Sequence, residues 1–491
     1  MIKEENLSAI RNKLEEILNN LDASSKSKIP LHQMERSIFN HLLSLGLLLL
    51  RHYIGLCQDV VESRVLTTFS PKHPFKSKGV SVRSYFSVFG ELSLIRSKYY
   101  CQGLGVYYPL DAYLGLPDTK YSYLIRDWLA YGATEMDFRQ SCDYLNHILG
   151  YNFSGMQSSR CTKALSLEVA SFYDQKSFSQ VSQEAYLSVG FDGKGVPMIL
   201  SELGKTADSS ATRLSKGQKR GSKKEATVSL SSSFTPKSRS PGQLIDALFK
   251  KPLQKKLMEE HKEPNDRHLW HEAKHLRAFI ADKPKAIHYG LSNLLARDTQ
   301  KNTPIVVLID GDRALRNQVE TQAKVLKMET RIEAYVLDFI HLLEYVWKVA
   351  NAYLGENHSE RTKWVEAQAL LLLNSKSKQV ITKWKAIQEL KHLSKNQREN
   401  VTKAITYLSN KEEMVDYKDY LKKGYPITTG AVESACGHFV KSRMERNAMH
   451  WSFKGGQNML NIRAVRKNHD WNDFLEFFIG KDQRRIYKKV A

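Results

Sequence analysis

The run Ile305–Ile309 contains only aliphatic residues, IVVLI, and is followed directly by Asp310 and Gly311. A short apolar run bounded by turn residues is typical of a strand that is buried on both faces of a sheet. Three other segments in this half of the chain, EAYLSVGFDG, EATVSLSSSF and RIEAYVLDF, are also strand-like, with helical stretches between them. The sequence therefore predicts an α/β sheet domain that comprises residues 183–345 and 424–480.

Residues 356–423 contain neither glycine nor proline, the residue types that most often end a helix. Segments such as VITKWKAIQELKHL repeat apolar residues at helical spacing within this stretch. We expect an all-helical insertion over residues 346–423, and a basic C-terminal tail over residues 481–491.

The beginning of the chain combines helical and strand-like patterns in a mostly α-helical region with a small β-sheet. In residues 1–70, Leu7, Ile10 and Leu14 recur at steps of three and four, which indicates helices that serve packing or dimerisation. Residues 71–118 include VSVRSYFSVFGELSLIRSKYYC, where β-branched and aromatic residues alternate with polar ones around a Phe-Gly turn. This pattern predicts a small antiparallel sheet.

Residues 119–178 contain three helical stretches separated by short turns, which is the layout of a helix-turn-helix DNA-binding unit. Arg160 and Lys163 lie on the last of these stretches and favour DNA binding. The alternative is an ordinary three-helix packing unit, because such triplets are common in other domains.

The composition indicates a polyanionic partner. The 491 residues include 74 Lys plus Arg and 52 Asp plus Glu, a formal charge of +22. The longest apolar stretch, LLSLGLLLL, is too short to span a membrane, and the N-terminus does not have the pattern of a secretory signal. The five scattered cysteines suggest reduced thiols, so we expect a cytoplasmic protein that associates with nucleic acid rather than with a membrane.

Three carboxylates stand where functional groups are often found in α/β domains. Asp192 and Asp310 each end a predicted strand and precede a glycine, and Glu433 lies in the first turns of a predicted amphipathic helix. Each also has an ordinary structural interpretation, because Asp before Gly suits a turn or a cap and Glu suits the start of a helix.

Taken together, three carboxylates from two strands and a helix would suit a pair of magnesium or manganese ions, which prefer hard oxygen ligands. Such ions would act on a phosphodiester, and Lys441, Arg443 and Arg446 follow Glu433 closely enough to hold its phosphate. This predicts a metal-dependent site for DNA.

Five motifs give the chain a resemblance to a known family: YLSVGFDGKGVPM, RLSKGQKRGSKKEATV, VVLIDGDRAL, LDFIHLLEYVW and GAVESACGHFVKSRMERNAMHWSFKGGQNMLNIRAVRKN. Over roughly residues 90–480 the sequence resembles the bacterial insertion-sequence transposases of the Kra type (ISKra-like), within the Mutator-like DDE transposases. The resemblance implies an RNase H-like fold, interrupted by a helical insertion, in which Asp192, Asp310 and Glu433 are the catalytic metal ligands.

The same resemblance assigns an auxiliary role near the site or DNA to Asp338 and His341, which match an acidic-x-x-His motif. From the residues alone, Asp338 is equally well interpreted as a helix N-cap, and the two roles are compatible. Asp312 competes with Asp310, because carboxylates two positions apart point to the same side of an extended chain. The motif favours Asp310.

Further DNA contacts are predicted from aromatic and basic residues. Trp451 could stack on an unpaired base, although an aromatic residue in an amphipathic segment more often belongs to the core. A cationic loop between two strands next to Asp192 could reach DNA, or could simply be solvated. Its basic residues are Lys216, Lys219, Arg220, Lys223 and Lys224.

These observations lead us to expect a transposase that binds terminal inverted repeats, cleaves DNA and joins the freed ends to target DNA, as a homodimer or larger homo-oligomer. The alternatives are an RNase H-like nuclease without joining activity and a domesticated DNA-binding protein.

Overall fold

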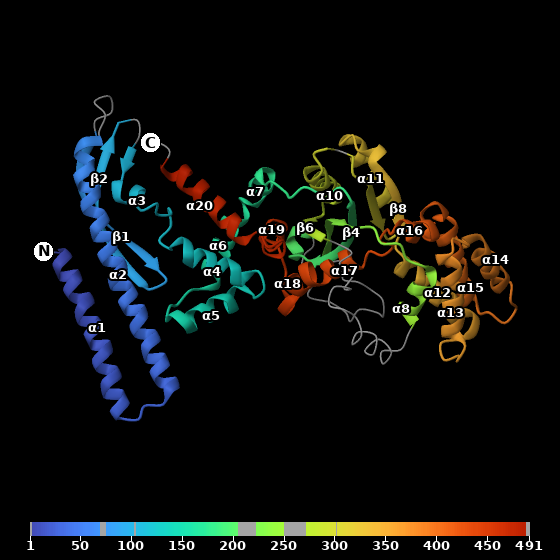
Figure 1. Ribbon diagram of the computed structural model, residues 1–491, viewed down its shortest axis with the longest axis horizontal. Helices are drawn as coiled ribbons and strands as arrows, with labels where there is room; N and C mark the ends of the chain where they lie inside the picture. Colours follow the sequence, from blue (N-terminus) through green and yellow to red (C-terminus); the bar gives the residue numbers. More distant parts are fainter. Residues whose placement is uncertain are drawn as a thin grey trace. The chain divides into compact units, whose positions relative to one another are not determined.

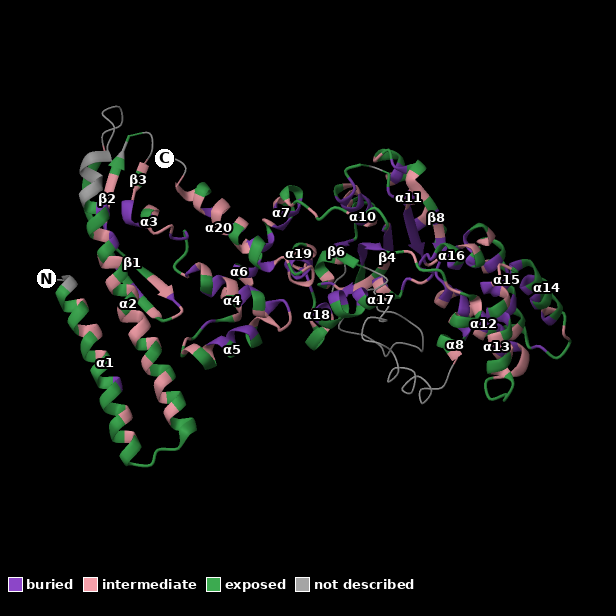
Figure 2. Ribbon diagram, viewed as in Figure 1, coloured by how far each residue is buried: buried purple, intermediate pink, exposed green. Residues whose placement is uncertain are grey.

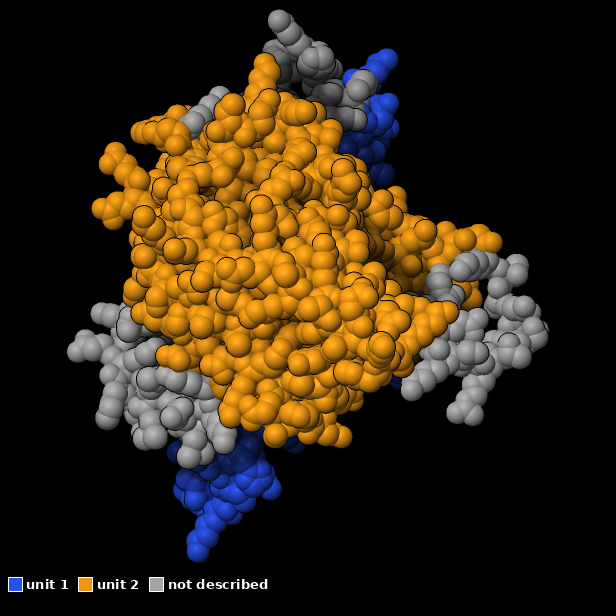
Figure 3. Space-filling view, turned by 90° about the vertical axis from the view of Figure 1, so that its right-hand side faces the viewer, with its two compact units in different colours: residues 1–172, 470–491 blue, residues 173–469 orange. Residues whose placement is uncertain are grey.

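A computed structural model describes residues 2–68, 75–102, 105–204, 222–249, 272–300 and 302–487. The chain forms two compact units (Figures 1 and 3). Unit 1 comprises Met1–Phe172 and Asp470–Ala491, and unit 2 comprises Tyr173–His469. None of the helices in the described ranges is long and apolar enough to cross a membrane.

Unit 1 begins with a long helical hairpin and a small sheet. Helices α1 (Ile2–Lys26) and α2 (Leu31–Thr68) are joined by a short turn that contains Pro30, which cannot continue α1. The sheet has the order β1-β2-β3, with antiparallel pairing throughout, and its first two strands are connected by a two-residue turn before Gly90. The predicted antiparallel sheet is therefore confirmed. Its strands are β1 (Lys76–Ser87), β2 (Gly90–Cys101) and β3 (Gly105–Tyr107).

A helical cluster follows, and the three predicted helices are present. Ser122 and Asp137 cap the first two by accepting a backbone N–H, and Ser154 forms a capping box at the third. Leu129, Cys142 and other apolar side chains form their common core. The helices of this region are α3 (Pro109–Tyr113), α4 (Tyr123–Ala133), α5 (Phe138–Leu149), α6 (Gly155–Ser166) and α7 (Val169–Gln175).

The C-terminus belongs to unit 1, which corrects two predicted boundaries. Residues 470–480 were expected in the sheet domain and residues 481–491 in a separate tail, but α20 (Trp471–Tyr487) runs across both. Trp471 donates its indole N–H to Asp127 at 2.8 Å, and Asp482 accepts the Tyr123 hydroxyl at 2.8 Å. These contacts between distant parts of the sequence hold the last helix against α4.

Unit 2 contains a five-stranded mixed sheet with the order β6-β5-β4-β7-β8. Strand β5 is antiparallel to β4 and β6, whereas β7 and β8 are parallel to β4. All five residues of β7 are buried, as the IVVLI run predicts, because helices cover the sheet on both faces. The strands are β4 (Tyr186–Pro197), β5 (Lys223–Phe234), β6 (Glu272–Ile280), β7 (Ile305–Ile309) and β8 (Ile332–Leu337).

Helices connect these strands and form an appended bundle. The chain between β8 and residue 423 is helical wherever it is regular, in agreement with the predicted insertion, and its fully buried Trp384 shares one apolar core with the sheet. The helices before the bundle are α8 (Pro241–Phe249), α10 (Lys283–Arg297) and α11 (Arg313–Val325). Those of the bundle are α12 (Phe339–Leu354), α13 (Arg361–Leu373), α14 (Ser377–Gln388), α15 (Lys395–Ser409) and α16 (Tyr417–Lys423). Short 3-10 helices are η1 (Leu200–Leu203), η3 (Glu329–Arg331) and η4 (Glu412–Met414).

The chain then returns to the sheet through an irregular helix, where one continuous amphipathic helix was expected. Glu433 lies in α17 (Gly430–Ala435), which passes into a π-helical turn, η5 (Cys436–Lys441). The helix then breaks at Asn447, whose φ of 52° is left-handed. The remaining elements are α18 (Ser442–Met444), η6 (Arg446–Ala448) and α19 (Phe453–Lys467).

Candidate functional site

Three aspartates lie side by side on neighbouring strands: Asp310 and Asp338 directly follow β7 and β8, and Asp192 lies within β4 beside them. Strands β4 and β7 pair in parallel with Gly190 beside Leu308, and the same register brings Asp192 beside Asp310. Strands β7 and β8 pair with Ile309 beside Leu337, so Asp338 follows in line. The Asp338 N–H donates to the Ile309 carbonyl at 2.9 Å, which fixes this alignment. Asp192 and Asp310 therefore lie on adjacent strands, and Asp310 follows its strand as predicted. The prediction that Asp192 ends its strand is wrong, because β4 continues to Pro197 and stays paired with β5 over that length.

Glu433 approaches this edge from α17. The helix comes close because Gly190 has no side chain: a Cβ there would lie 3.2 Å from Val432 Cγ1. Thr429, just before the helix, connects Glu433 to Asp338. Its N–H donates to Asp338 Oδ2 at 3.1 Å, and its hydroxyl lies 2.6 Å from Glu433 Oε1 and also contacts the Asp338 carboxylate.

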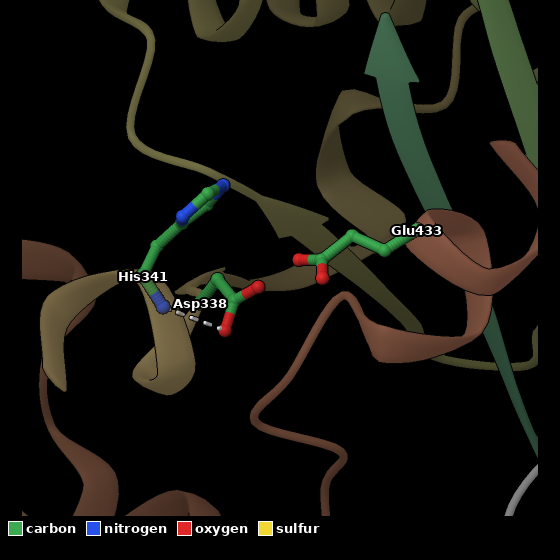
Figure 4. Close-up of side chains that lie close together, drawn as sticks. All are labelled: Asp338, His341 and Glu433. Carbon is green, nitrogen blue, oxygen red and sulfur yellow. Dashed lines mark hydrogen bonds between the residues drawn. The ribbon is translucent and has the colours of Figure 1, made fainter. Parts of the chain in front are cut away.

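Asp338, His341 and Glu433 form a compact group (Figure 4). One possible ligand atom from each lies within 4.8 Å of the others, and Figure 4 shows the Glu433 carboxylate directed towards Asp338. Asp338 is fully buried and also caps α12, because its Oδ1 accepts the backbone N–H groups of Ile340 at 2.7 Å and His341 at 3.4 Å. The cap interpretation of Asp338 is confirmed, and the same side chain borders the candidate site.

Burial and repulsion by neighbouring carboxylates raise the pKa of two of these groups, Asp192 and Glu433. Burial raises the pKa of Asp192, and the charges of Glu433 and Asp310 raise it further, against hydrogen bonds from Cys436 and the Gly193 N–H. Burial likewise raises the pKa of Glu433, an effect that Thr429 opposes and Asp338 reinforces. A cation placed among these groups would relieve both penalties.

The turn after β7 explains the different positions of Asp310 and Asp312. Gly311 has a φ of +87°, which glycine adopts readily, so the chain is not extended here and the two carboxylates do not share a side. The Asp312 N–H donates to Asp310 Oδ1 at 2.9 Å, while the Asp312 side chain caps α11 at Ala314. Asp312 is exposed and lies 3.8 Å from the Lys283 ammonium, so its role is structural.

Sequence reasoning missed two groups from the helical bundle that reach Asp310. The Tyr407 hydroxyl donates to the Asp310 carbonyl at 2.7 Å. The Lys411 side chain packs over Gly311, where a Cβ would collide with its Cε. Burial lowers the pKa of Lys411, and the negative charges of Asp310 and Asp312 raise it. These residues lie far from Asp310 in sequence, and no local pattern identifies them.

Cys436 is a third contact that the sequence did not identify. It is buried, and its thiol donates a hydrogen bond to the Asp192 carboxylate. Burial, followed by the negative charge of Asp192, raises the pKa of the Cys436 thiol, so the group stays protonated and keeps its hydrogen. Its position three residues after Glu433, on the same helical face, was the available signal.

Two of the predicted DNA contacts are instead part of the protein interior. Arg443 is fully buried, with its guanidinium 5.1 Å from the Trp451 ring centroid, and its Nη1 lies 2.9 Å from Met449 Sδ. Trp451 is also buried, and its indole N–H donates to the Met444 carbonyl at 3.0 Å. Neither side chain is available to DNA in this structure. Lys441 and Arg446 are exposed.

The cationic loop is only partly covered by the structure. Lys216, Lys219 and Arg220 lie outside the described residues. Lys223 and Lys224 are exposed but begin strand β5, so their expected position in a loop is wrong. Lys223 forms an ion pair with Glu445 at 2.6 Å. In unit 1, Arg160 and Lys163 are both exposed on α6.

A scan against protein-family models finds no match to this chain, and a search of curated proteins finds none.

Proposed function

We propose that the protein is a DDE transposase that binds terminal inverted repeats and catalyses metal-dependent cleavage and strand transfer of DNA. The observation that carries this proposal is the alignment of three aspartates on adjacent strands, with Glu433 directed towards Asp338. Asp310 and Asp338 directly follow β7 and β8, and Asp192 lies beside them within β4. A cluster of partly buried carboxylates around the fully buried Asp338 has little use in folding, because the like charges repel one another.

The architecture of unit 2 supports an RNase H-like assignment. The sheet has three consecutive antiparallel strands followed by two strands parallel to the first, and the helical bundle separates this sheet from α17. That order agrees with the fold expected from the resemblance to Mutator-like transposases. It brings residues far apart in sequence to one edge, as the proposed chemistry requires.

The carboxylates suit magnesium or manganese, because these ions prefer oxygen ligands in an open coordination sphere. Asp192, Asp310 and Glu433 would hold two ions, and Asp338 would orient Glu433 through Thr429. Bound ions supply activation of the attacking oxygen and stabilisation of the leaving one. Cys436 holds the Asp192 carboxylate in place, and Tyr407 holds the backbone at Asp310.

The remaining parts of the chain are assigned to DNA recognition and assembly. Exposed Arg160 and Lys163 on α6 agree with DNA binding by the α4–α6 cluster, and exposed Lys441 and Arg446 follow the site. The formal charge of +22 supports a DNA partner. Pairing of two element ends requires at least a homodimer.

The test combines purified protein, Mg²⁺, a labelled end of the element that encodes the chain, and a target plasmid. We expect cleaved and joined products from the wild type and none from Glu433→Gln, which removes a ligand oxygen charge but keeps the helix. Glu413→Gln, the same change on the exposed surface of the bundle, is the matched control and should retain activity. Cleavage without joining would assign a nuclease, DNA binding alone would assign a domesticated protein, and joining by Glu433→Gln would reject the site.

A further inference from the structure

A groove on the helical bundle opens beside the candidate site. It has a volume of about 580 Å³ and lies between α12 and α15. Among its lining residues, every charged side chain is a lysine, and the others are asparagine, threonine and tyrosine. The residues that matter for the argument are Tyr345, Lys348, Lys403, Tyr407 and Lys411.

The floor of the groove is a rigid aromatic pair that carries two of the ammonium groups. The rings of Tyr345 and Tyr407 stack at 4.0 Å with an interplanar angle of 16°. The Lys348 ammonium lies 4.3 Å from the Tyr345 ring centroid, and that of Lys411 lies 4.0 Å from Tyr407. Cation–π contacts restrict these long side chains, so less entropy is lost when they bind a ligand.

The inner end of the groove is continuous with the candidate catalytic edge. Tyr407 belongs to the groove and also donates to the Asp310 carbonyl, while Lys411 packs on Gly311. A polyanion that occupied the groove would therefore have one end at Asp310, next to the candidate site. Lys403 stands on the exposed surface of α15, eight positions before Lys411, and extends the positive lining away from the sheet.

We propose that this groove binds the phosphodiester backbone of the DNA strand that leaves the candidate site. The inference rests on the proposed function and adds to it a substrate path along the bundle. Isolated ammonium groups suit phosphates, each as a point charge, and the asparagine amides can donate to phosphate or sugar oxygens. The tyrosines already stack on each other, so we assign them to supporting the lysines and not to base stacking.

The test measures DNA binding as a function of salt in the Glu433→Gln background, so that no cleavage is needed. The double variant Lys348→Gln/Lys403→Gln removes two groove cations, and Lys378→Gln/Lys383→Gln removes two exposed cations from α14, which does not line the groove. Loss of two phosphate contacts should reduce the slope of log K against log salt by about 1.8. The control pair should leave the slope unchanged.

The proposal that the groove binds DNA would be wrong if the salt slope of DNA binding were unchanged in the groove variant, or changed equally in both variants. So would a groove variant that loses binding to polyglutamate but keeps its binding to DNA, because that result would assign the groove to an acidic protein. Cleavage by the otherwise wild-type enzyme is scored separately. If the wild type cleaves DNA but the groove variant has an unchanged salt slope, only this inference is wrong. If the salt slope falls as expected but the wild type does not cleave DNA, only the proposed catalysis is wrong.

A different observation supports a second inference, which concerns the α1–α2 hairpin. Nine large apolar side chains within helices α1 and α2 are 37–56% exposed, and those on α2, from Phe39 onward, recur at steps of three, four and seven. Ile29 in the turn and Leu31 at the start of α2 are also exposed but lie outside this pattern. In Figure 2, α1 is coloured mainly as exposed, unlike the strands of unit 2. The nine are Leu7, Leu14, Leu18, Phe39, Leu42, Leu49, Tyr53, Leu56 and Val60.

This apolar face is distinct from the other three sides of α2. One side packs on the small sheet through Leu47, Leu50 and Ile54, and another packs on α1. A further side is polar and includes Asn40 and Arg51. Because α1 and α2 run antiparallel, the helical periodicity turns the exposed stripes of both helices to the same side of the hairpin. The result is a flat, two-helix apolar surface.

We infer that this surface pairs with the same surface of a second copy to form a four-helix bundle. Covering the nine side chains would remove roughly 750 Å² from water on each copy, close to the roughly 800 Å² per partner of a standard interface. A two-fold axis makes any such face complementary to itself, and two helical hairpins that meet in this way form a common bundle.

Sedimentation or light scattering of the full chain over a concentration series tests this interface. We expect a dimer whose dissociation constant rises at least 100-fold in Leu42→Ser/Leu49→Ser and stays unchanged in Asn40→Ser/Arg51→Ser on the polar side. Circular dichroism should show equal helix content in both variants. The inference would be wrong if the wild type were monomeric at tens of micromolar, or if the Leu42→Ser/Leu49→Ser change left the dimer dissociation constant unaltered.

Discussion

The sheet edge of unit 2 and the α1–α2 hairpin of unit 1 depart from ordinary burial in opposite directions. Asp338 is fully buried at the site, and Arg443 and Arg463 are fully buried in the segment that follows Glu433 and in α19, whereas Leu18 and Tyr53 on the hairpin are 55% and 56% exposed. Buried charge and exposed apolar surface are the two arrangements that folding alone does not favour. This contrast agrees with the proposals that the site in unit 2 holds polar groups for chemistry and that the hairpin of unit 1 associates with a second copy.

The largest effect should come from Arg463→Ala. Arg463 is fully buried and donates to the carbonyl oxygens of Phe439 at 2.8 Å and His438 at 2.7 Å, both in the π-helical turn η5. Its removal leaves these acceptors unsatisfied and opens a cavity, so we expect a loss of about 3–5 kcal/mol in the stability of unit 2. Hydrogen exchange of residues 430–448 measures it.

The control for this change is Lys454→Ala, which removes an exposed cation from the same helix, α19. It should leave hydrogen exchange of the π-helical segment unchanged. Equal protection of residues 430–448 in the Arg463 variant and the wild type would show that the buried guanidinium does not hold the Glu433 helix in place.

Leu337→Ala should have the next largest effect. Leu337 is fully buried at the end of β8, immediately before Asp338. Truncation of a buried leucine in a sheet core costs about 2–5 kcal/mol through lost burial and the remaining cavity. Denaturant unfolding followed by exchange of the β7 and β8 amides checks this value. A cost below about 1 kcal/mol would contradict the tight packing of the sheet beneath the site.

The sequence predicts those parts of the site whose backbone conformation is determined by residues close together in the chain. The apolar run Ile305–Ile309 could only be a buried strand, so its terminal Asp310 was placed correctly. An extended chain was expected over Asp310–Asp312, although glycine at position 311 also permits a left-handed turn. The structure has that turn, and it directs the Asp312 side chain away from Asp310. Residues close together in sequence were therefore sufficient to predict strand β7 and nearly sufficient to predict the turn that follows it.

The segment after Glu433 shows what could not be predicted. A regular helix was assumed for Arg443 and Arg446, but the π-helical turn changes the helical phase and the chain breaks at Asn447. Arg443 therefore turns inward. Arg463, far along the chain, donates to carbonyl groups within the π-helical turn, and no local propensity specifies that pairing.

A smaller effect on folding is expected from Asp338→Asn. Asparagine is as good an N-cap as aspartate, so α12 should keep its cap and stability should fall by only about 1 kcal/mol. The substitution removes the charge that raises the pKa of Glu433 and changes the hydrogen bonds of Thr429. Mn²⁺ binding measured by electron paramagnetic resonance should weaken about 10–100-fold, as for other groups that orient a metal ligand. Unchanged Mn²⁺ affinity would restrict Asp338 to capping.

Leu49→Ala should have the smallest effect on folding and gives the sharpest comparison, because it makes the same chemical change as Leu337→Ala. Leu49 is 49% exposed on the hairpin face, so its truncation creates no enclosed cavity, and monomer stability should change by less than about 0.5 kcal/mol. Unfolding must be measured at protein concentrations below the dimer dissociation constant, where association contributes nothing. If the change cost as much there as in β8, the hairpin face would be packed within a single chain, and the contrast between the two regions would disappear.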